Sequence, residues 1–223
     1  MASSPRAPKT YQAFLFDMDG TLITSTAAAE RVWSRWGRRH GLDLARFIPT
    51  IHGVRAADTI RRQNLPDIDL AAEVAWVERG EIEDVEGVAP IPGAIDFVRR
   101  LPPDRWAVVT SATVPLARAR LAAAGVTPPE LMITAERVEK GKPDPAGYRL
   151  AAETLGFDIA DCLVFEDAEA GIRAGEAAGA DLIVVTAAWT HALETPHPRL
   201  ADYAQAQLTV EDDGRLTFSP PPA

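Results

Sequence analysis

Two aspartates follow a short apolar run in the segment FLFDMDGT, which spans residues 14–21. If the run is a buried strand of a parallel sheet, Asp17 and Asp19 lie just beyond its carboxyl end, where such sheets bind their ligands. A simple Asx-type turn would accept the same residues. A calcium-binding loop shares the Asp-x-Asp spacing but needs a glutamate where this chain has Ala28, so that loop is excluded.

Hydroxyl groups and a lysine provide two further signals. The segment VVTSAT at 108–113 places Thr110 and Ser111 at the end of a second apolar run, where a helix cap is the simpler interpretation. The segment KGKPDP at 140–145 carries Lys142 in a chain with only three lysines, and an ammonium group can contact a phosphate oxygen and a carboxylate at once. A solvated surface charge is the alternative for Lys142, and more so for Lys140.

An acidic pair, Glu166 and Asp167, follows a further apolar run at 163–165. Asp167 alone could be the N-cap of the next helix. Together with Asp17 and Asp19 the pair would bring four carboxylates to one place, and each close pair costs about 4 kcal/mol at an effective dielectric of about 20. A cation is therefore required. Oxygen ligands without His or Cys indicate a hard ion, most simply Mg²⁺, and with a lysine and hydroxyls this set predicts a phosphoryl-transfer site.

The elements that must position these residues alternate along the chain. Short apolar runs predict buried strands at 13–16, 106–109, 131–133, 163–165 and 182–185. Helical segments are predicted between them at 93–101, 115–124, 145–155 and 168–178. Strands that alternate with helices favour an α/β fold with a parallel sheet and helices on both faces, so the four signals meet at one edge of the sheet.

The interval from residue 24 to 88 breaks this alternation, because it contains no convincing strand. Two stripes at helical spacing predict a small inserted helical bundle there. The stripes are Ala29, Val32, Trp33 and Trp36, and Ile68, Ala72, Ala75, Trp76 and Arg79. We expect the tryptophans to form the core of this bundle rather than a sugar-stacking face. The predicted boundaries are a core domain at 11–23 and 89–217, a helical domain at 24–88, and disordered tails at 1–10 and 218–223.

The composition limits the classes of partner. The chain has 223 residues, 47% of them hydrophobic, and a formal net charge of −9. An acidic chain without a dense basic run is a poor candidate for binding nucleic acid or anionic membranes. A single cysteine, Cys162, cannot form an internal disulfide, and the N-terminus lacks the apolar stretch of a signal peptide. We therefore expect a cytoplasmic protein, as a monomer.

The four motifs resemble those of the haloacid dehalogenase superfamily, in which Asp-x-Asp-x-Thr, a strand-end Ser or Thr, a Lys and an acidic pair follow one another in that order. The likeness runs from about Tyr11 to Thr190. Because the long interval in this chain follows the first motif, the resemblance implies a Rossmann-like α/β core with an all-helical cap domain inserted at that point.

The resemblance also implies roles for the motif residues. Asp17 would attack phosphorus and become an aspartyl-phosphate, and Asp19 would act first as acid and then as base. Thr110, Ser111 and the backbone N–H of Ala112 would bind the phosphoryl group, and Lys142 would bridge phosphate and nucleophile. Mg²⁺ would be held by Asp17, Asp19 through its carbonyl, and Asp167, with Glu166 as a ligand or just behind one.

The likeness is closest to sugar phosphatases and to glycerol-3-phosphate and 2-deoxyglucose-6-phosphate phosphatases, through segments 52–58 (HGVRAAD) and 133–143 (ITAERVEKGKP). It implies a Mg²⁺-dependent phosphatase acting on a small phosphorylated sugar or polyol. Dehalogenases lack the second aspartate. β-Phosphoglucomutases carry a histidine where this chain has Ala29, so a phosphomutase is the alternative, and a non-catalytic phosphosugar-binding module is a third. His52 and Arg55 are candidates for contacting the leaving group, with helix-end capping as the simpler interpretation.

Overall fold

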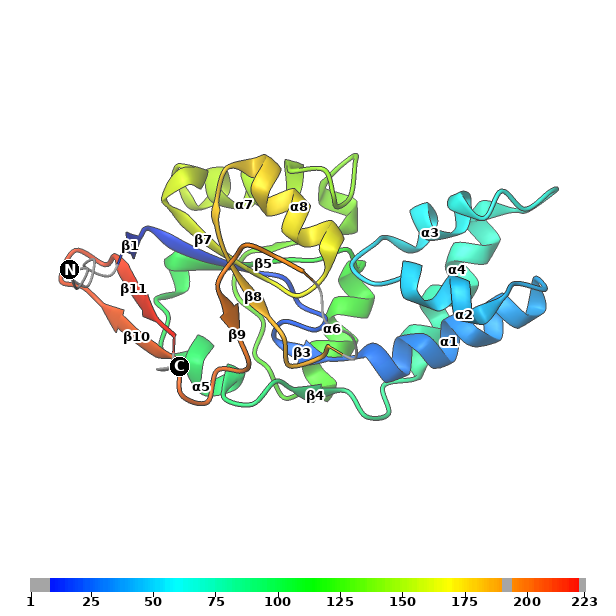
Figure 1. The fold of residues 1–223 in the computed structure, drawn as a ribbon, viewed down its shortest axis with the longest axis horizontal. Helices are drawn as coiled ribbons and strands as arrows, with labels where there is room; N and C mark the ends of the chain where they lie inside the picture. The colour runs from blue at the N-terminus through cyan, green and yellow to red at the C-terminus, as the bar shows by residue number, and fades with distance from the viewer. Residues whose placement is uncertain (1–8, 190–193, 221–223) are drawn as a thin grey trace.

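A six-stranded parallel sheet forms the centre of the protein in this computed structural model, which describes residues 9–189 and 194–220. The strands, in spatial order, are β6 (Met132–Ile133), β5 (Trp106–Val109), β2 (Ala13–Phe16), β7 (Cys162–Glu166), β8 (Asp181–Val185) and β9 (Arg199–Leu200). The five predicted strands all form, and β2 and β5 have the predicted bounds. The α/β fold is confirmed (Figure 1).

Helices cover both faces of this sheet. They are α5 (Ala94–Arg99), α6 (Val114–Ala123), α7 (Ala146–Leu155) and α8 (Glu169–Ala178). Successive residues of a strand point to opposite faces, so Phe14 and Phe16 pack in the same core as Phe97 of α5, while Leu15 packs in the same core as Tyr148 of α7. Short 3₁₀ helices connect some of these elements, at Pro103–Arg105, Ala135–Arg137 and Ile159–Asp161.

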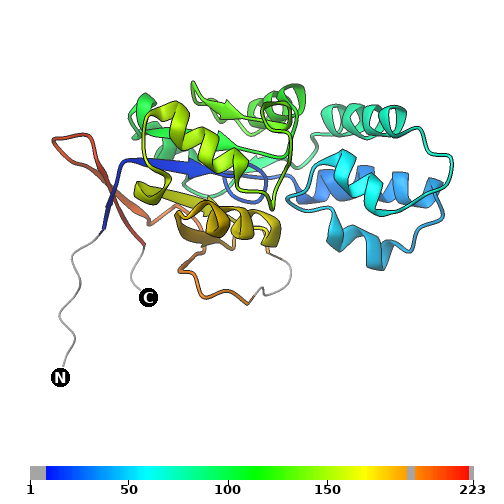
Figure 2. The same ribbon diagram turned by 90° about the horizontal axis from the view of Figure 1, so that it is seen from above.

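The interval after β2 forms a separate helical unit, called the cap below. It contains α1 (Thr26–Arg39), α2 (Leu44–Phe47), a 3₁₀ turn (Ile48–Thr50), α3 (Ala56–Arg62) and α4 (Leu70–Glu83). Trp33, Trp36 and Phe47 pack in its own apolar core, as expected for the first two. Where the chain enters and leaves the cap, β3 (Ile23–Thr24) pairs antiparallel with β4 (Ala89–Pro90), and Figure 2 shows the cap at one end of the sheet. The exact domain boundaries stay a prediction.

The second predicted stripe of the cap is correct only for Ile68 and Trp76, which are partly buried and pack against the apolar core of the cap. Ala72, Ala75 and Arg79 are exposed, and the buried residues of α4 are Val77 and Glu81. The reason is a close approach of two helices: a Cβ on Gly80 would lie 2.9 Å from Val32 of α1. Helix α4 therefore packs the face that carries Val77 and Glu81 against the rest of the cap. The pattern of Ala72, Ala75 and Arg79 in the sequence does not show this orientation.

The predicted tails are shorter than expected. Thr10 belongs to β1 (Thr10–Tyr11), which pairs antiparallel with β11 (Leu216–Ser219), and β11 pairs with β10 (Gln207–Val210). Phe218 lies within the predicted C-terminal tail, but it is buried against Phe165 with ring centroids 5.2 Å apart. Burial of this aromatic ring stabilises the strand, although a proline-rich segment follows it. Residues 1–8 and 221–223 lie outside the described residues, and within the described part no helix is long and apolar enough to cross a membrane.

Candidate active site

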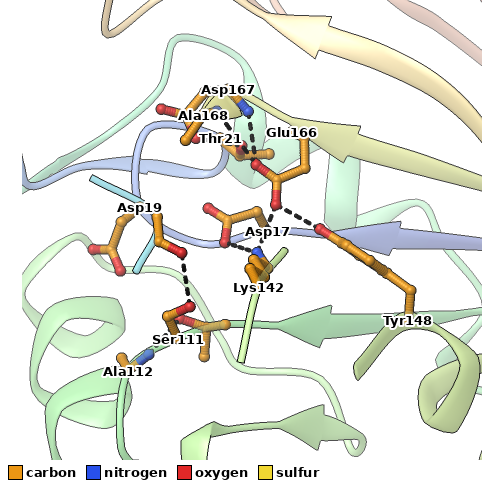
Figure 3. Close-up of polar contacts among 12 residues, drawn as sticks. Asp17, Asp19, Thr21, Ser111, Ala112, Lys142, Tyr148, Glu166, Asp167 and Ala168 are labelled. Carbon is orange, nitrogen blue, oxygen red and sulfur yellow. Dashed lines mark hydrogen bonds and ion pairs between the residues drawn. The ribbon is translucent and has the colours of Figure 1, made fainter. Parts of the chain in front are cut away.

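Asp17 and Lys142 form the centre of the site. The backbone N–H of Asp17 donates to the carbonyl of Phe165 at 2.9 Å, which fixes the end of β2 against the end of β7. Lys142 donates from Nζ to Oδ1 of Asp17 and to Oε1 of Glu166, the latter at 2.6 Å (Figure 3). All three side chains are buried. Burial alone would lower the pKa of Lys142, but the two carboxylates raise it, so the ammonium stays charged.

Glu166 is held from several directions. Tyr148 of α7 donates from its hydroxyl to Oε1 at 2.7 Å, and the N–H of Asp167 donates to Oε2 at 3.0 Å. Helix α8 passes so close that a Cβ on Gly171 would lie 1.7 Å from Oε1. Glycine is therefore required there to leave room for the carboxylate. Tyr148 was missed by the sequence analysis, because nothing in the spacing of α7 marks it apart from the other core residues.

The acidic side chains fit a hard divalent cation. Asp17, Glu166 and Asp167 each offer a carboxylate oxygen, and these oxygens lie within 4.8 Å of one another. Burial, together with the neighbouring carboxylates, raises the pKa of Asp167 well above its usual range, and the same causes raise that of Asp17 against the opposing effect of Lys142. A set of oxygen donors that repel one another suits Mg²⁺. The side chain of Asp19 lies outside this group, and its carbonyl was the expected ligand.

Asp19 points instead into a separate polar cluster. Its Oδ1 accepts from the hydroxyl of Ser25 at 2.5 Å and from Nη1 of Arg120 at 3.0 Å, while Nη2 of Arg120 donates to Oε1 of Glu81 at 3.0 Å. Ser25, Arg120 and Glu81 were not predicted from the sequence as residues of the site. The available signal was a charge on an apolar helix face: Arg120 shares its face with Leu116 and Leu121.

The polar groups of the hydroxyl segment already form hydrogen bonds within the protein. Ser111 donates from Oγ to the carbonyl of Gly53 in the cap at 2.9 Å, and the N–H of Ala112 donates to Oγ1 of Thr110 at 3.1 Å. The cap loop is in close contact with the core here, since a Cβ on Gly53 would lie 2.9 Å from the Cβ of Ala168. A phosphate bound by Ser111 and Ala112 must therefore replace these internal hydrogen bonds.

His52 and Arg55 differ in what they contact. Nε2 of His52 lies 3.5 Å from Oε1 of Glu30, and burial lowers the pKa of His52. Arg55 precedes α3 but makes no capping hydrogen bond with its side chain. Its guanidinium donates to the carbonyl of Glu139 at 3.1 Å, in the core loop that leads to Lys142. Arg55 thus joins the cap to the core.

A cavity of about 360 Å³ lies between cap and core. The core lines it with Asp17, Asp19, Thr110, Ser111, Ala112, Arg120 and Asp167, and the cap with Trp33, His52, Arg55, Glu78 and Glu81 among others. Lys142 contacts Asp17 at this cavity, and Glu166 contacts Lys142. The structure therefore brings together every residue that the four motifs singled out, and it puts the two cap candidates on the wall of the same cavity.

This fold and these motifs define a hydrolase family. The family model described as haloacid dehalogenase-like hydrolase matches residues 11–179, and the chain belongs to this family. It is 44% identical over 180 residues to hexitol phosphatase A of Escherichia coli (strain K12), covering 79% of this chain and 83% of that protein. It is 32% identical over 216 residues to 2-deoxyglucose-6-phosphate phosphatase 1 of Saccharomyces cerevisiae (strain ATCC 204508 / S288c), covering 87% of each. A hydrolase from Pseudomonas syringae has the same fold, with a TM-score of 0.76, 22% identity, and coverage of 86% of this chain and 94% of that one.

Proposed function

We propose that the protein is a Mg²⁺-dependent phosphatase that releases inorganic phosphate from small phosphorylated sugars or polyols. The observation that carries the proposal is the position of Asp17: its carboxylate is buried beside Lys142 and two further acidic side chains, yet it lines the cavity between cap and core. A carboxylate that is held by a lysine and lines a cavity is placed to attack a phosphoryl group bound there. Relatives that act on a hexitol phosphate and on 2-deoxyglucose 6-phosphate support the substrate class.

The reaction takes two steps. In the first, a carboxylate oxygen of Asp17 forms a bond to phosphorus, the bond from phosphorus to the ester oxygen breaks, and the leaving alkoxide takes a proton from Asp19. In the second, water attacks phosphorus and gives its proton back to Asp19, and the bond from phosphorus to Asp17 breaks. The enzyme returns to its starting state with one alcohol and one phosphate released.

The remaining residues bind charge. Lys142 contacts Asp17 directly and would also reach a phosphoryl oxygen. Ser111 and the N–H of Ala112 would bind the other oxygens after giving up Gly53 and Thr110. Asp17, Asp167 and the carbonyl of Asp19 would hold Mg²⁺, with Glu166 beside them. When bound, the ion would offset the negative charge of the phosphoryl oxygens and of the carboxylates.

The wall formed by the cap favours an uncharged leaving group. Glu78 and Glu81 present carboxylates to the cavity. Arg55 and Arg61, which also line it, both pair with Asp58, each at 2.9 Å. A second phosphate would therefore meet acidic groups and cations that already have partners. This favours a sugar or polyol monophosphate over the bisphosphate that a phosphomutase requires.

We further infer that the enzyme works in the cytoplasm as a monomer.

Phosphate release from a panel of sugar and polyol phosphates tests the proposal. We expect release in the presence of Mg²⁺, loss with EDTA, and a loss of at least about 1,000-fold in Asp17→Asn, because the nucleophile is gone. Asp19→Asn should lose about 100- to 10,000-fold. Interconversion of sugar phosphates with little free phosphate would support a phosphomutase instead. Tight binding without turnover, unchanged by Asp17→Asn, would support a binding module.

A further inference from the structure

Arg120 is a charged side chain in an apolar setting. It lies on α6 on the same face as Leu116, Ala117 and Leu121, and only 5% of it is exposed. A buried charge is stable only when it is paired and hydrogen-bonded. Both partners of Arg120 are carboxylates, and they belong to different parts of the molecule.

The guanidinium connects the core to the cap. Nη1 donates to Oδ1 of Asp19 at 3.0 Å, and Nη2 donates to Oε1 of Glu81 at 3.0 Å. Asp19 follows strand β2 of the core, whereas Glu81 is on helix α4 of the cap and is 6% exposed. All three side chains line the cavity that the leaving group would occupy. One planar group thus spans from the residue that transfers the proton to the domain that covers the substrate.

The hydrogen bonds leave one oxygen of Asp19 available. Oδ1 accepts from both Arg120 and Ser25. Two donors on the same oxygen fix the plane of the carboxyl group, and within the described residues Oδ2 has no hydrogen-bond partner. Oδ2 is therefore the oxygen that can exchange a proton with the ester oxygen or with water, since general acid–base transfer needs direct hydrogen-bond contact.

The cluster is poorly arranged for stability alone. Within the described part of the chain, Nε of Arg120 is buried without a hydrogen-bond partner, and burial raises the pKa of Glu81 above its usual range despite Arg120. Buried ion pairs are weak contributors to stability, so the pairing of Arg120 with two carboxylates is not explained by stability alone.

We infer that Arg120 is a positioning residue: held on one side by Glu81 of the docked cap, it aims the Asp19 carboxyl group at the leaving oxygen, so that acid–base catalysis is complete only when the cap is docked. The inference rests on the proposed phosphatase function. It adds a residue outside the four motifs and gives the cap a part in proton transfer, in addition to covering the substrate.

The test compares Arg120→Lys, Glu81→Gln and the control Arg39→Lys. Arg39 also pairs with a glutamate of α4, Glu73, but it does not line the cavity. With the best alkyl phosphate of the panel, we expect kcat of Arg120→Lys to fall about 10- to 100-fold with KM nearly unchanged. Glu81→Gln should change kcat in the same direction by less, and Arg39→Lys should match the wild type. In an Asp19→Asn background, Arg120→Lys should add no further loss.

p-Nitrophenyl phosphate separates positioning from damage to the fold. Its leaving group needs no proton, so the first step should survive in Arg120→Lys, whereas hydrolysis of the aspartyl-phosphate still needs Asp19. We expect a rapid release of about one nitrophenolate per enzyme followed by a slow phase. The inference would be overturned if the burst of Arg120→Lys were smaller only in proportion to the loss of folded protein, and if its slow rate per active enzyme equalled that of the wild type.

The two hypotheses fail differently. A wild-type protein that releases no phosphate from any ester overturns the proposed function and this inference with it. An active wild type beside Arg120→Lys and Glu81→Gln variants that keep kcat on alkyl phosphates within about twofold overturns the inference alone. Thermal unfolding of each variant, measured in parallel, sets the assay temperature well below every transition.

Discussion

At the scale of single residues, the site places three carboxylates close together, and the single charge of Lys142 does not balance them. Asp17, Glu166 and Asp167 offer oxygens within 4.8 Å of one another, and Lys142 contacts the first two. Burial raises the pKa values of Asp17 and Asp167. A divalent cation that binds only the folded state should therefore stabilise it.

Mg²⁺ should raise the melting temperature of the wild-type protein, and Asp167→Asn should remove most of that shift, because it replaces a charged ligand by a neutral amide. Differential scanning fluorimetry over a range of Mg²⁺ concentrations measures this without any substrate. Asp213→Asn, an exposed position whose partner is Arg215, is the matched control and should keep the full shift. Equal shifts in all three proteins would contradict the proposed ligand set.

At the scale of elements, tight turns at the ends of β2 and β7 hold the site residues in place. Gly20 has φ of +89°, which L-residues rarely adopt, and a Cβ there would lie 2.0 Å from Oδ2 of Asp167. Gly156 at the end of α7 has nearly the same φ, +84°, but a Cβ there meets nothing within 4 Å. The two glycines share the same backbone requirement and differ in their surroundings.

Gly20→Ala and Gly156→Ala should both lose about 1–2 kcal/mol of unfolding free energy, the cost of a left-handed conformation with a Cβ. Only Gly20→Ala should also lose the Mg²⁺-induced rise in melting temperature and most phosphate release, because its methyl group displaces Asp167. Urea unfolding and the phosphate assay measure the two effects. Retention of full activity by Gly20→Ala would show that the turn tolerates the displacement.

At the scale of the whole molecule, the cap is docked through helix α4, which pairs with Arg120 of α6, and through a loop that contacts several core segments. Gly53 accepts from Ser111 and approaches Ala168, and Arg55 donates to the carbonyl of Glu139. A Cβ on Gly141 would lie 2.5 Å from Nε of Arg55, so the guanidinium packs directly on the loop that carries Lys142. Arg55 is thus placed to stabilise the docked position of the cap.

Arg55→Met should weaken docking and lower kcat/KM about tenfold, since hydrogen bonds from a charged group contribute about 1.5–3 kcal/mol. Small-angle scattering should show a larger radius of gyration as the cap spends more time away from the core. Arg46→Met removes an arginine of the cap that is 90% exposed and should change neither quantity. An unchanged radius of gyration in Arg55→Met would contradict a docking role.

The sequence by itself determined the sheet and the motif residues at its edge. Apolar runs such as 13–16 favour buried strands because helical segments separate them along the chain. Parallel strands then bring Asp17, Ser111 and Glu166 to one edge of the sheet. The same reasoning failed for the inward face of α4 and for Phe218, because both depend on which surfaces meet.

Only the tertiary structure decided how Asp19 is held. Arg120 and Glu81 are 39 residues apart and lie on helices of different parts of the protein, so no local pattern pairs them. Strand periodicity and motif spacing are properties of neighbouring residues, whereas an ion pair between cap and core depends on the relative placement of two separately packed units. That placement is set by side-chain packing over the whole chain, which a single sequence does not display.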